Sequence, residues 1–206
     1  EGWHQFSQKS LRDALPTWAE EGLACWMEGT RMNRDGQPTA FRPWRNFERW
    51  NEARNAVGND ATMSLEELLD TSPQKCLERG KNDLLTYYAQ VWALVHFLNE
   101  GQDGRHREGL RAMLRDAAAG AMQARMEAAA PALDAEARRR AVRARNGPLA
   151  FRAYFGDDLR GISEAYDDFL EAITRRGAGD RIWRGENPLS EPAPSAPAAP
   201  TPPAAK

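Results

Sequence analysis

The chain has 206 residues, of which 41% are hydrophobic and 28% are charged, enough for one domain with a substantial core. Its formal net charge of −2 gives no overall attraction to nucleic acid, and no run of apolar residues is long enough to span a bilayer. We therefore expect no nucleic-acid partner and no membrane-spanning segment. Neither a substrate nor an oligomeric state follows from composition.

The chain begins with part of a metal-binding pattern. The segment Glu1–His4 reads E-G-W-H, the last four letters of H-E-x-x-H without the first histidine. In that pattern the two histidines share one helix face and reach one Zn²⁺, while the glutamate lies beside the open position of the metal. We expect a truncated motif with a histidine directly upstream, Glu1 as the general base and His4 as a zinc ligand.

A second acidic segment follows shortly afterwards. Residues 18–24 read W-A-E-E-G-L-A. A catalytic zinc takes three protein ligands and keeps its fourth position for water or substrate. Glu21 is the expected third ligand, which would complete a set of two histidines and one carboxylate. Thr17, followed by Glu20 at capping-box spacing, is the expected N-cap of a helix over residues 18–30.

These two segments resemble the gluzincin metallopeptidases. In that group H-E-x-x-H is followed on a second helix by E-G-[LF]-A-x-[YW]-x-E, and Glu21–Glu28 reads E-G-L-A-C-W-M-E. The chain looks most similar to uncharacterised bacterial families described as peptidase MA-like, and more distantly to aminopeptidase N-type enzymes. The resemblance covers residue 1 to about residue 175.

A third segment agrees with this resemblance. Tyr88–Leu98 is similar to the Y-x-x-[GS]-x-x-x-x-x-x-L helix of those aminopeptidases, whose tyrosine stabilises the oxyanion, and this implies that role for Tyr88. Val91 stands where a small residue is usual. The apolar stripe of this helix passes through Tyr88, which predicts an interior ring. Tyr87 shares its face with Asp83 and Gln90 and is expected to meet solvent or a polar edge.

The resemblance implies the fold class, cofactor and reaction. We expect a mainly α protein, the C-terminal helical part of a zincin-like domain whose upstream β-sheet is missing. The cofactor would be Zn²⁺, the substrate a peptide or protein, and the site of action outside the cytoplasm. The full-length protein would hydrolyse peptide bonds, with a leaning towards endopeptidase action, whereas the 206-residue chain itself is expected to be inactive.

A different class of function stays open beside this one. The chain could be a catalytically dead, zincin-like helical domain that serves in binding or as a structural unit. Glu20 and Glu21 could form a solvated helix face, and Tyr87 and Tyr88 could be core aromatics. The residue directly upstream of Glu1 separates the two hypotheses, because a histidine there favours the enzyme.

Other candidate ligands are weaker. His96 is expected to be a partly buried helix residue, and His106 a solvated residue of a polar loop. Cys25 lies within reach of the helix face of Glu21, where a small packing residue is usual. Cys25 and Cys76 are expected to be free thiols, with a disulfide between them as the open alternative.

The rest of the chain predicts helices without convincing strands. Residues 31–62 read as a long ordered loop with a short helix near 46–56, a possible wall of a substrate cleft. Ser64 and Glu67 form a capping box for a short helix that ends before Pro73. Further helices are expected over 83–100, 105–130, 133–146 and 162–176. Arginines 138–145 most resemble a solvated face, with a basic binding patch as the alternative.

The composition changes abruptly at residue 187. From there to residue 206 the chain is rich in proline and alanine, which cannot bury enough apolar surface to offset the entropy of ordering. We expect a helical domain over residues 1–186 and a disordered tail over residues 187–206.

Overall fold

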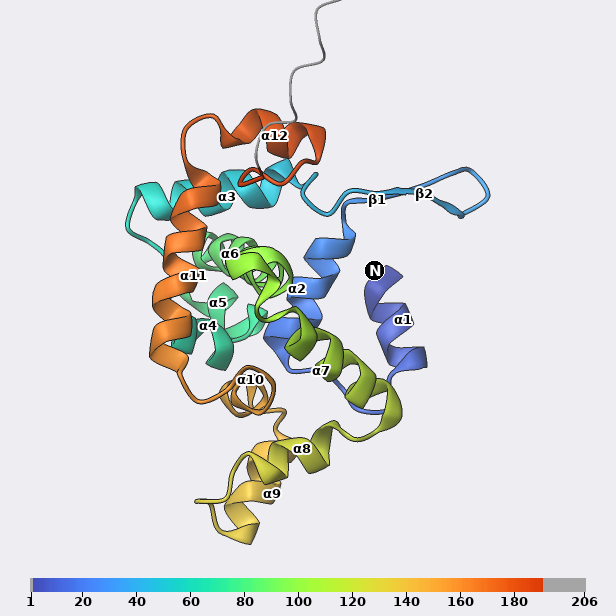
Figure 1. Ribbon diagram of the computed structural model, residues 1–206, viewed down its shortest axis with the longest axis vertical. Coiled ribbons are helices and arrows are strands. Elements are labelled where there is room, and N and C mark those ends of the chain that lie inside the picture. The colour runs from blue at the N-terminus through green and yellow to red at the C-terminus, as the bar shows by residue number, and fades with distance from the viewer. Residues whose placement is uncertain (1, 191–206) are drawn as a thin grey trace, which may run out of the picture.

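The computed structural model describes residues 2–190 and is mainly helical, which confirms the expected fold class (Figure 1). The helices are α1 (Gly2–Ser10), α2 (Thr17–Met27), α3 (Phe47–Gly58), α4 (Leu65–Asp70), α5 (Pro73–Arg79), α6 (Lys81–Glu100), α7 (Arg107–Ala119), α8 (Met122–Ala128), α9 (Ala135–Arg143), α10 (Gly147–Phe155), α11 (Leu159–Thr174) and α12 (Ala178–Arg184). A 3-10 turn occupies Gly101–Gly104, and the strands are β1 (Thr30–Met32) and β2 (Pro38–Phe41).

Helix α6 forms the centre of the molecule, where Figure 1 shows it nearly end-on. Helices α2, α3, α5, α7 and α11 all pack against it, so its polar face is buried as well as its apolar stripe. Gln90 is fully buried because its side-chain amide bonds both backbone groups of Met63, accepting at 2.7 Å and donating at 2.9 Å. The helix predicted over residues 83–100 is therefore present, but every residue from Ala89 to Leu98 is buried, whichever face it lies on.

Aromatic side chains fill the core around α6. Trp18 of α2 contacts Phe151 of α10 edge-on, and Phe97 of α6 contacts Tyr166 of α11 in the same way. These four rings are almost completely buried. They connect the central helix to the layers on either side, since aromatic rings bring the largest apolar area into a core.

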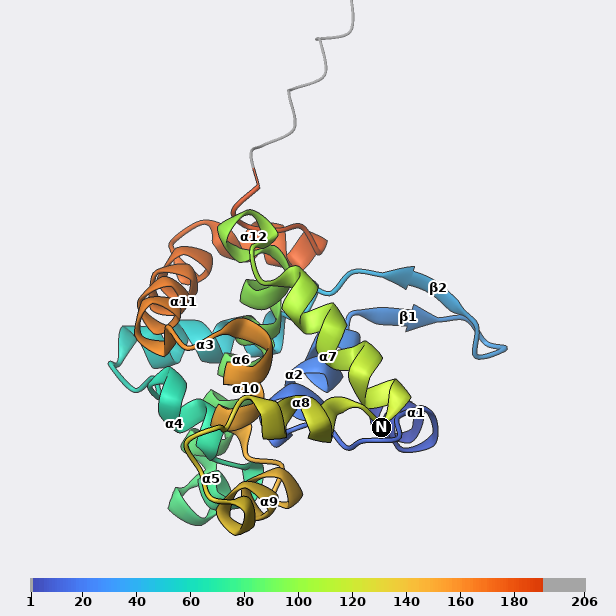
Figure 2. The same ribbon diagram turned by 60° about the horizontal axis from the view of Figure 1, so that its bottom comes forward.

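The loop after α2 contains a β-hairpin that the sequence did not predict. Strands β1 and β2 pair antiparallel, with Thr30 opposite Phe41 and Arg31 opposite Ala40. Figures 1 and 2 both show the hairpin projecting away from the helices. Each strand is too short for its side-chain alternation to stand out in the sequence, which explains the wrong expectation.

Helix boundaries follow their capping residues in most places. The Ser64 side chain accepts the Glu67 N–H, as the capping box predicts, and α4 ends before Pro73. The expected long helix over residues 105–130 is broken at Gly120, which has a left-handed backbone with φ 77° and ψ 28°. Helices α5, α10 and α12 were not predicted.

The N-cap expected at Thr17 does not form. Thr17 is the first helical residue of α2, Pro16 precedes it, and no side chain caps this end. Glu20, the expected partner in the capping box, points instead to helix α1, where it contacts His4 and Ser7. A tertiary contact has therefore replaced a local one.

None of the helices between residues 2 and 190 is long and apolar enough to cross a membrane.

The start of the expected tail contacts the central helix. The Asn187 side chain donates a 2.8 Å hydrogen bond to Glu100, so this first residue of the expected tail lies against α6. Residues 191–206, the rest of that expected tail, lie outside the described residues.

Candidate metal centre

His4 lies between two consecutive carboxylates of another helix. Helix α1 packs against α2, and the His4 ring meets α2 where Glu20 and Glu21 occur. Its Nδ1 is 3.1 Å from Oε1 of Glu20, and its Nε2 is 3.8 Å from Oε2 of Glu21. Successive residues on a helix point about 100° apart, so the two carboxylates approach the imidazole from different sides. The structure thus brings the two expected ligands, His4 and Glu21, together.

Ser7 fixes the position of the Glu20 carboxylate. Its hydroxyl donates to Oε1 of Glu20 at 2.5 Å and also lies 3.1 Å from the His4 carbonyl oxygen, one turn earlier in α1. Ser7 is buried, so this contact is shielded from water. Sequence reasoning missed both Ser7 and Glu20, although Ser7 follows His4 at the helical spacing that places two residues on one face.

Glu21 is a desolvated carboxylate. Its side chain is 21% exposed, and burial raises the pKa of Glu21 above its ordinary value, with Glu20 adding to the rise and His4 opposing it. Within residues 2–190, neither Glu20 nor Glu21 has a lysine or arginine nitrogen within 4.0 Å, and His4 is the basic group that each one meets. Two carboxylates thus share one imidazole, an arrangement that favours an additional cation.

Close packing of α2 on α6 sets the place of Glu21. A Cβ at Gly22 would lie 2.7 Å from the Val91 carbonyl oxygen and 2.8 Å from a Val95 methyl group. The two helices touch here because Gly22 has no side chain. Val91 stands where the resemblance predicts a small residue, and the small residue at this helix contact is Gly22 of α2.

The two tyrosines of α6 are oriented differently from the sequence expectation. Tyr87, expected at a polar edge, is fully buried, and its hydroxyl has no hydrogen-bond partner among the described residues. Tyr88, expected in the interior, is only partly buried, and the Arg49 guanidinium lies 5.1 Å from its ring centroid. The expectation was wrong because neighbours cover α6 on its polar face.

The Tyr88 hydroxyl nevertheless lies close enough to Glu21 to be affected by its charge. Burial raises the pKa of its hydroxyl, and the charge of Glu21 is the next largest cause of that rise. The pKa of the Tyr87 hydroxyl is also raised, first by burial and then by the charge of Glu21, so Glu21 affects both hydroxyl groups. Of the two, only Tyr88 retains a partly exposed ring from which a hydroxyl can meet a bound molecule.

Cys25 is a buried thiol of α2. Desolvation raises the pKa of this thiol to about 12. Cys25 and Cys76 are both buried and free, on α2 and α5. Glu28 is the last residue of the segment Glu21–Glu28 discussed above. Its carboxylate accepts hydrogen bonds from Asn46 and Arg49, and these contacts connect α2 to α3.

The two other histidines are more buried than expected. His96 is fully buried, its ring stacks on Trp44 with centroids 3.7 Å apart, and its Nδ1 is 3.3 Å from Glu100. His106, expected to be solvated, is 7% exposed and packs between Phe97 and Phe155. Neither lies in the His4 site.

Glu1, the expected general base, lies outside the described residues. Within residues 2–190, no group of three or more histidine, cysteine, aspartate and glutamate side chains is arranged to hold a metal ion. A cavity of about 300 Å³ opens beside the cluster, and His4, Ser7 and Glu20 line one side of it. The described part of the site therefore offers His4 and Glu21, two of the three protein ligands that the resemblance implies, and of these two His4 lines the cavity.

Comparisons with protein-family models, with curated proteins and with solved structures found no match for this chain.

Proposed function

We propose that the protein is a zinc-dependent peptide hydrolase whose metal centre is formed by His4, Glu21 and a histidine directly upstream of Glu1. The observation that carries this proposal is the contact of one imidazole with two carboxylates that have no lysine or arginine partner in residues 2–190. An imidazole nitrogen and a carboxylate oxygen are ligands that zinc binds well. Their separation of 3.8 Å leaves room for a metal ion after a small adjustment, since two ligands about 2.1 Å from one tetrahedral ion lie roughly 3.4 Å apart.

Zinc bound there would supply Lewis-acid activation of a water molecule and of the peptide carbonyl. In this proposal Glu1 accepts the proton of the attacking water and passes it to the departing amine. The Tyr88 hydroxyl donates a hydrogen bond to the carbonyl oxygen as negative charge develops on it. The roles of Glu1 and Tyr88 come from the family resemblance. The burial of Tyr88 beside Glu21 supports the role of Tyr88.

Glu20 has a different role in this proposal. It holds the Nδ1 side of His4 and leaves Nε2 directed towards Glu21. A carboxylate on the second nitrogen of a metal-binding histidine selects the tautomer and increases the basicity of the ligating nitrogen. Glu20 is thus a positioning residue and Glu21 the ligand, although the two are adjacent in the chain.

The test uses the chain extended by its natural upstream sequence. After dialysis, zinc content is measured by mass spectrometry, and hydrolysis is followed with casein. We expect stoichiometric zinc and turnover in the extended protein, zinc without turnover in Glu1→Gln, and neither in His4→Ala or Glu21→Ala. Glu127→Gln, a change at an exposed residue of α8, serves as the matched control and should leave both unchanged.

Two results would contradict the proposal. Full activity of Glu1→Gln would mean that the base is another group. An extended protein that folds but binds no zinc would favour the alternative class, a zincin-like helical binding or structural domain without catalysis. The 206-residue chain alone should bind zinc only weakly and show no peptidase activity, because it has two of the three ligands.

A further inference from the structure

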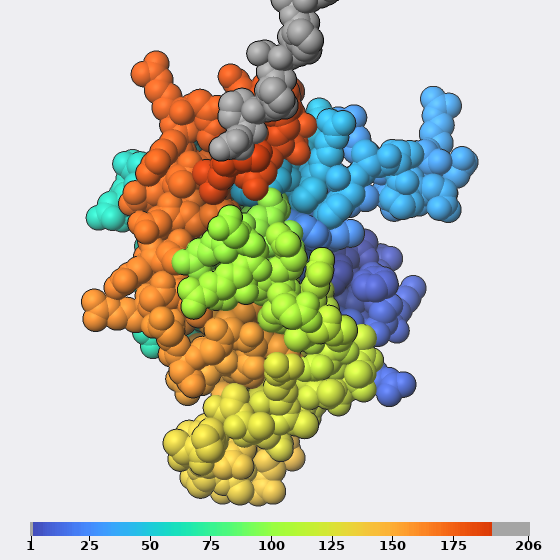
Figure 3. All heavy atoms as spheres, viewed as in Figure 1, coloured from blue at the N-terminus to red at the C-terminus, as the bar shows by residue number. Residues whose placement is uncertain are grey.

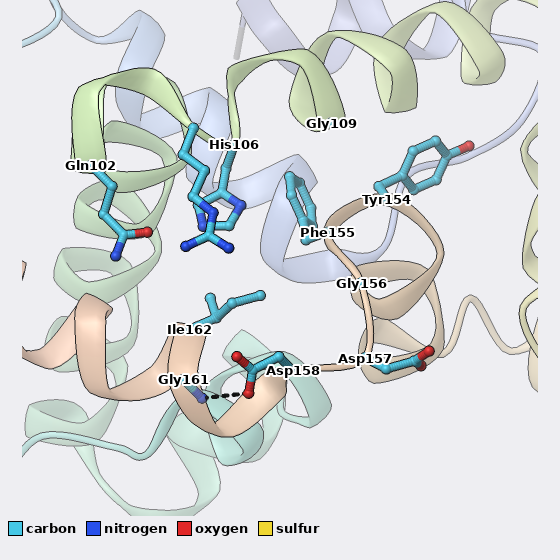
Figure 4. A pocket seen from close by; sticks show the side chains of 11 residues that line it. Gln102, His106, Gly109, Tyr154, Phe155, Gly156, Asp157, Asp158, Gly161 and Ile162 are labelled. Carbon is cyan, nitrogen blue, oxygen red and sulfur yellow. Dashed lines mark hydrogen bonds between the residues drawn. The ribbon is translucent and has the colours of Figure 1, made fainter.

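A second hollow of about 440 Å³ lies away from the His4 site. It is bounded by the start of α7, the end of α10 and the start of α11, and Figure 4 shows the side chains that line it. In the space-filling view the start of α7 lies on the same face as α11 (Figure 3). The proposed hydrolase function makes no use of this place.

Two polar side chains enter the hollow from the turn before α7. Gln102 and Arg105 both line the hollow, and Figure 4 shows the Gln102 amide reaching into it. Within residues 2–190, the Arg105 guanidinium has no carboxylate within 4.0 Å. Gln102 and Asp103 both adopt left-handed backbone conformations, with φ of 49° and 58°, and this turn brings the two side chains to one side.

His106 lies deeper in the same hollow. It is 7% exposed, it lines the hollow, and its Nε2 has no hydrogen-bond partner among the described residues. Burial, and secondarily the charge of Arg105, lower the pKa of His106, so the ring is neutral at pH 7 and has one N–H to donate. A buried polar atom without a partner is uncommon in native proteins and points to a missing hydrogen-bond partner.

Helix α7 begins at the wall of this hollow. Its N-terminus has no side-chain cap, so the first backbone N–H groups remain available to an acceptor. Gly109 in this first turn also lines the hollow. A Cβ there would lie 2.6 Å from the Tyr154 carbonyl oxygen, so glycine allows the start of α7 to pack directly on α10.

The two aspartates at the rim make contacts of their own, a backbone hydrogen bond for Asp158 and an ion pair for Asp157. Asp158 caps α11 by accepting the Gly161 N–H at 3.0 Å, as drawn in Figure 4. Asp157 lies 3.2 Å from the Arg152 guanidinium. The side of the hollow formed by Arg105, His106 and the α7 N-terminus therefore presents hydrogen-bond donors, and among the described residues no carboxylate lies within 4.0 Å of the Arg105 charge.

We infer that this hollow binds a small organic anion whose carboxylate or phosphate group is held by Arg105, His106 and the N-terminus of α7. Arginine offers two parallel donors to such a group, and the helix N-terminus adds backbone donors and a favourable dipole. The volume exceeds that of the oxyanion alone, so the rest of the ligand lies against Ile162 and Phe155. This inference does not depend on the proposed hydrolase function.

The test is an NMR titration of the ¹⁵N-labelled chain with inorganic phosphate and, separately, with acetate. We expect saturable shifts of the Gly109 amide at millimolar concentrations, because each probe fills only part of the hollow. Arg105→Gln should weaken binding about tenfold, which corresponds to the loss of one charge-assisted contact. Arg111→Gln, which removes a positive charge from an exposed position of the same helix, should leave the affinity unchanged.

His106→Gln provides a second variant. It should also weaken binding, provided that its far-ultraviolet circular dichroism matches that of the parent protein. Saturation by phosphate alone would assign a phosphate-bearing ligand, and equal binding of acetate a carboxylate. The inference is overturned if neither probe gives saturable shifts at Gly109, or if Arg105→Gln binds as tightly as the parent. Zinc content and hydrolysis do not enter this experiment, so its failure is distinct from failure of the proposed function.

Discussion

Nδ1 of His4 lies 3.1 Å from Oε1 of Glu20, and Glu20 in turn accepts a hydrogen bond from the buried Ser7 hydroxyl. In the proposed metal centre, this relationship distinguishes the roles of the two adjacent glutamates. Glu20 is occupied on the Nδ1 side of the ring, so Nε2 and Glu21 remain as the pair that can share a metal ion.

In the chain extended by its upstream sequence, Glu21→Gln should abolish tight zinc binding because a ligand is removed. Glu20→Gln should weaken zinc binding by about 10–100-fold, the usual effect of losing the hydrogen-bond partner of a ligating histidine. Competition with a chromogenic chelator measures both affinities. If Glu20→Gln lost zinc completely and Glu21→Gln did not, the two roles would be reversed.

Tyr88 should matter for turnover and Tyr87 should not. In the extended enzyme, Tyr88→Phe should lower kcat by about 10²–10³-fold with little change in KM, because it removes one donor to the developing oxyanion. Tyr87→Phe is the matched control, since its hydroxyl is buried in the core. Steady-state kinetics on one peptide substrate would decide the question, and a loss confined to Tyr87→Phe would reject the assignment of Tyr88.

Tyrosine-to-phenylalanine substitutions at Tyr87 and Tyr166 should change the stability of the fold in opposite directions. The Tyr87 hydroxyl is buried without a partner, whereas the Tyr166 hydroxyl donates a 2.8 Å hydrogen bond to the Gln90 carbonyl oxygen. Tyr87→Phe should therefore raise the free energy of unfolding by about 1 kcal/mol, and Tyr166→Phe should lower it by about 1 kcal/mol. Urea denaturation of the 206-residue chain measures both values. Equal destabilisation by the two changes would show that Tyr87 has a partner in solution.

Gly22→Ala tests the close contact of α2 with α6. The added methyl group would meet the Val91 carbonyl oxygen at 2.7 Å, so the helices must separate, and we expect a loss of about 1–3 kcal/mol in the free energy of unfolding. Gly58→Ala at the end of α3 is the control, because nothing lies within 4 Å of a Cβ there. The contact would be unimportant if both substitutions gave the same midpoint in urea.

His96 predicts a pH dependence of stability. Burial lowers the pKa of His96 below its ordinary value of 6.5, despite the opposing effect of Glu100. The unfolded chain then binds more protons than the folded one below pH 6.5, so the free energy of unfolding should fall as the pH decreases from there. The pKa of Glu100 is also lowered, by its hydrogen bonds from His96 and Trp44, so its contribution is lost only at more acidic pH, below its ordinary 4.5.

The variant for this prediction is His96→Gln, which keeps a polar side chain beside Glu100. Urea unfolding at several pH values between 5 and 8 compares the variant with the parent. We expect a shallower slope below pH 6.5 in the variant, because the titrating group is gone. Parallel slopes would show that His96 does not contribute to acid sensitivity.

The sequence by itself determined the helical character of the protein and most of its helix positions. Periodic apolar residues predicted the core helix over residues 83–100, and Ser64 predicted the start of α4, because both signals depend on local geometry. The segments Glu1–His4 and Trp18–Ala24 also predicted His4 and Glu21 as ligands of one site, and these two side chains lie 3.8 Å apart. These are properties that a helix repeat or a short motif carries within a few turns.

Only the tertiary structure decided which faces are buried. Tyr87 and Gln90 form a polar strip in the sequence, yet both are buried because neighbouring helices surround α6 and Met63 satisfies the Gln90 amide. Glu20 has the spacing of a capping residue, yet it contacts His4 because α1 packs beside α2. A sequence pattern gives the side chains of one face, but the partners of that face come from segments distant in the chain, and those partners decide whether a polar group meets water, a hydrogen bond or a metal ion.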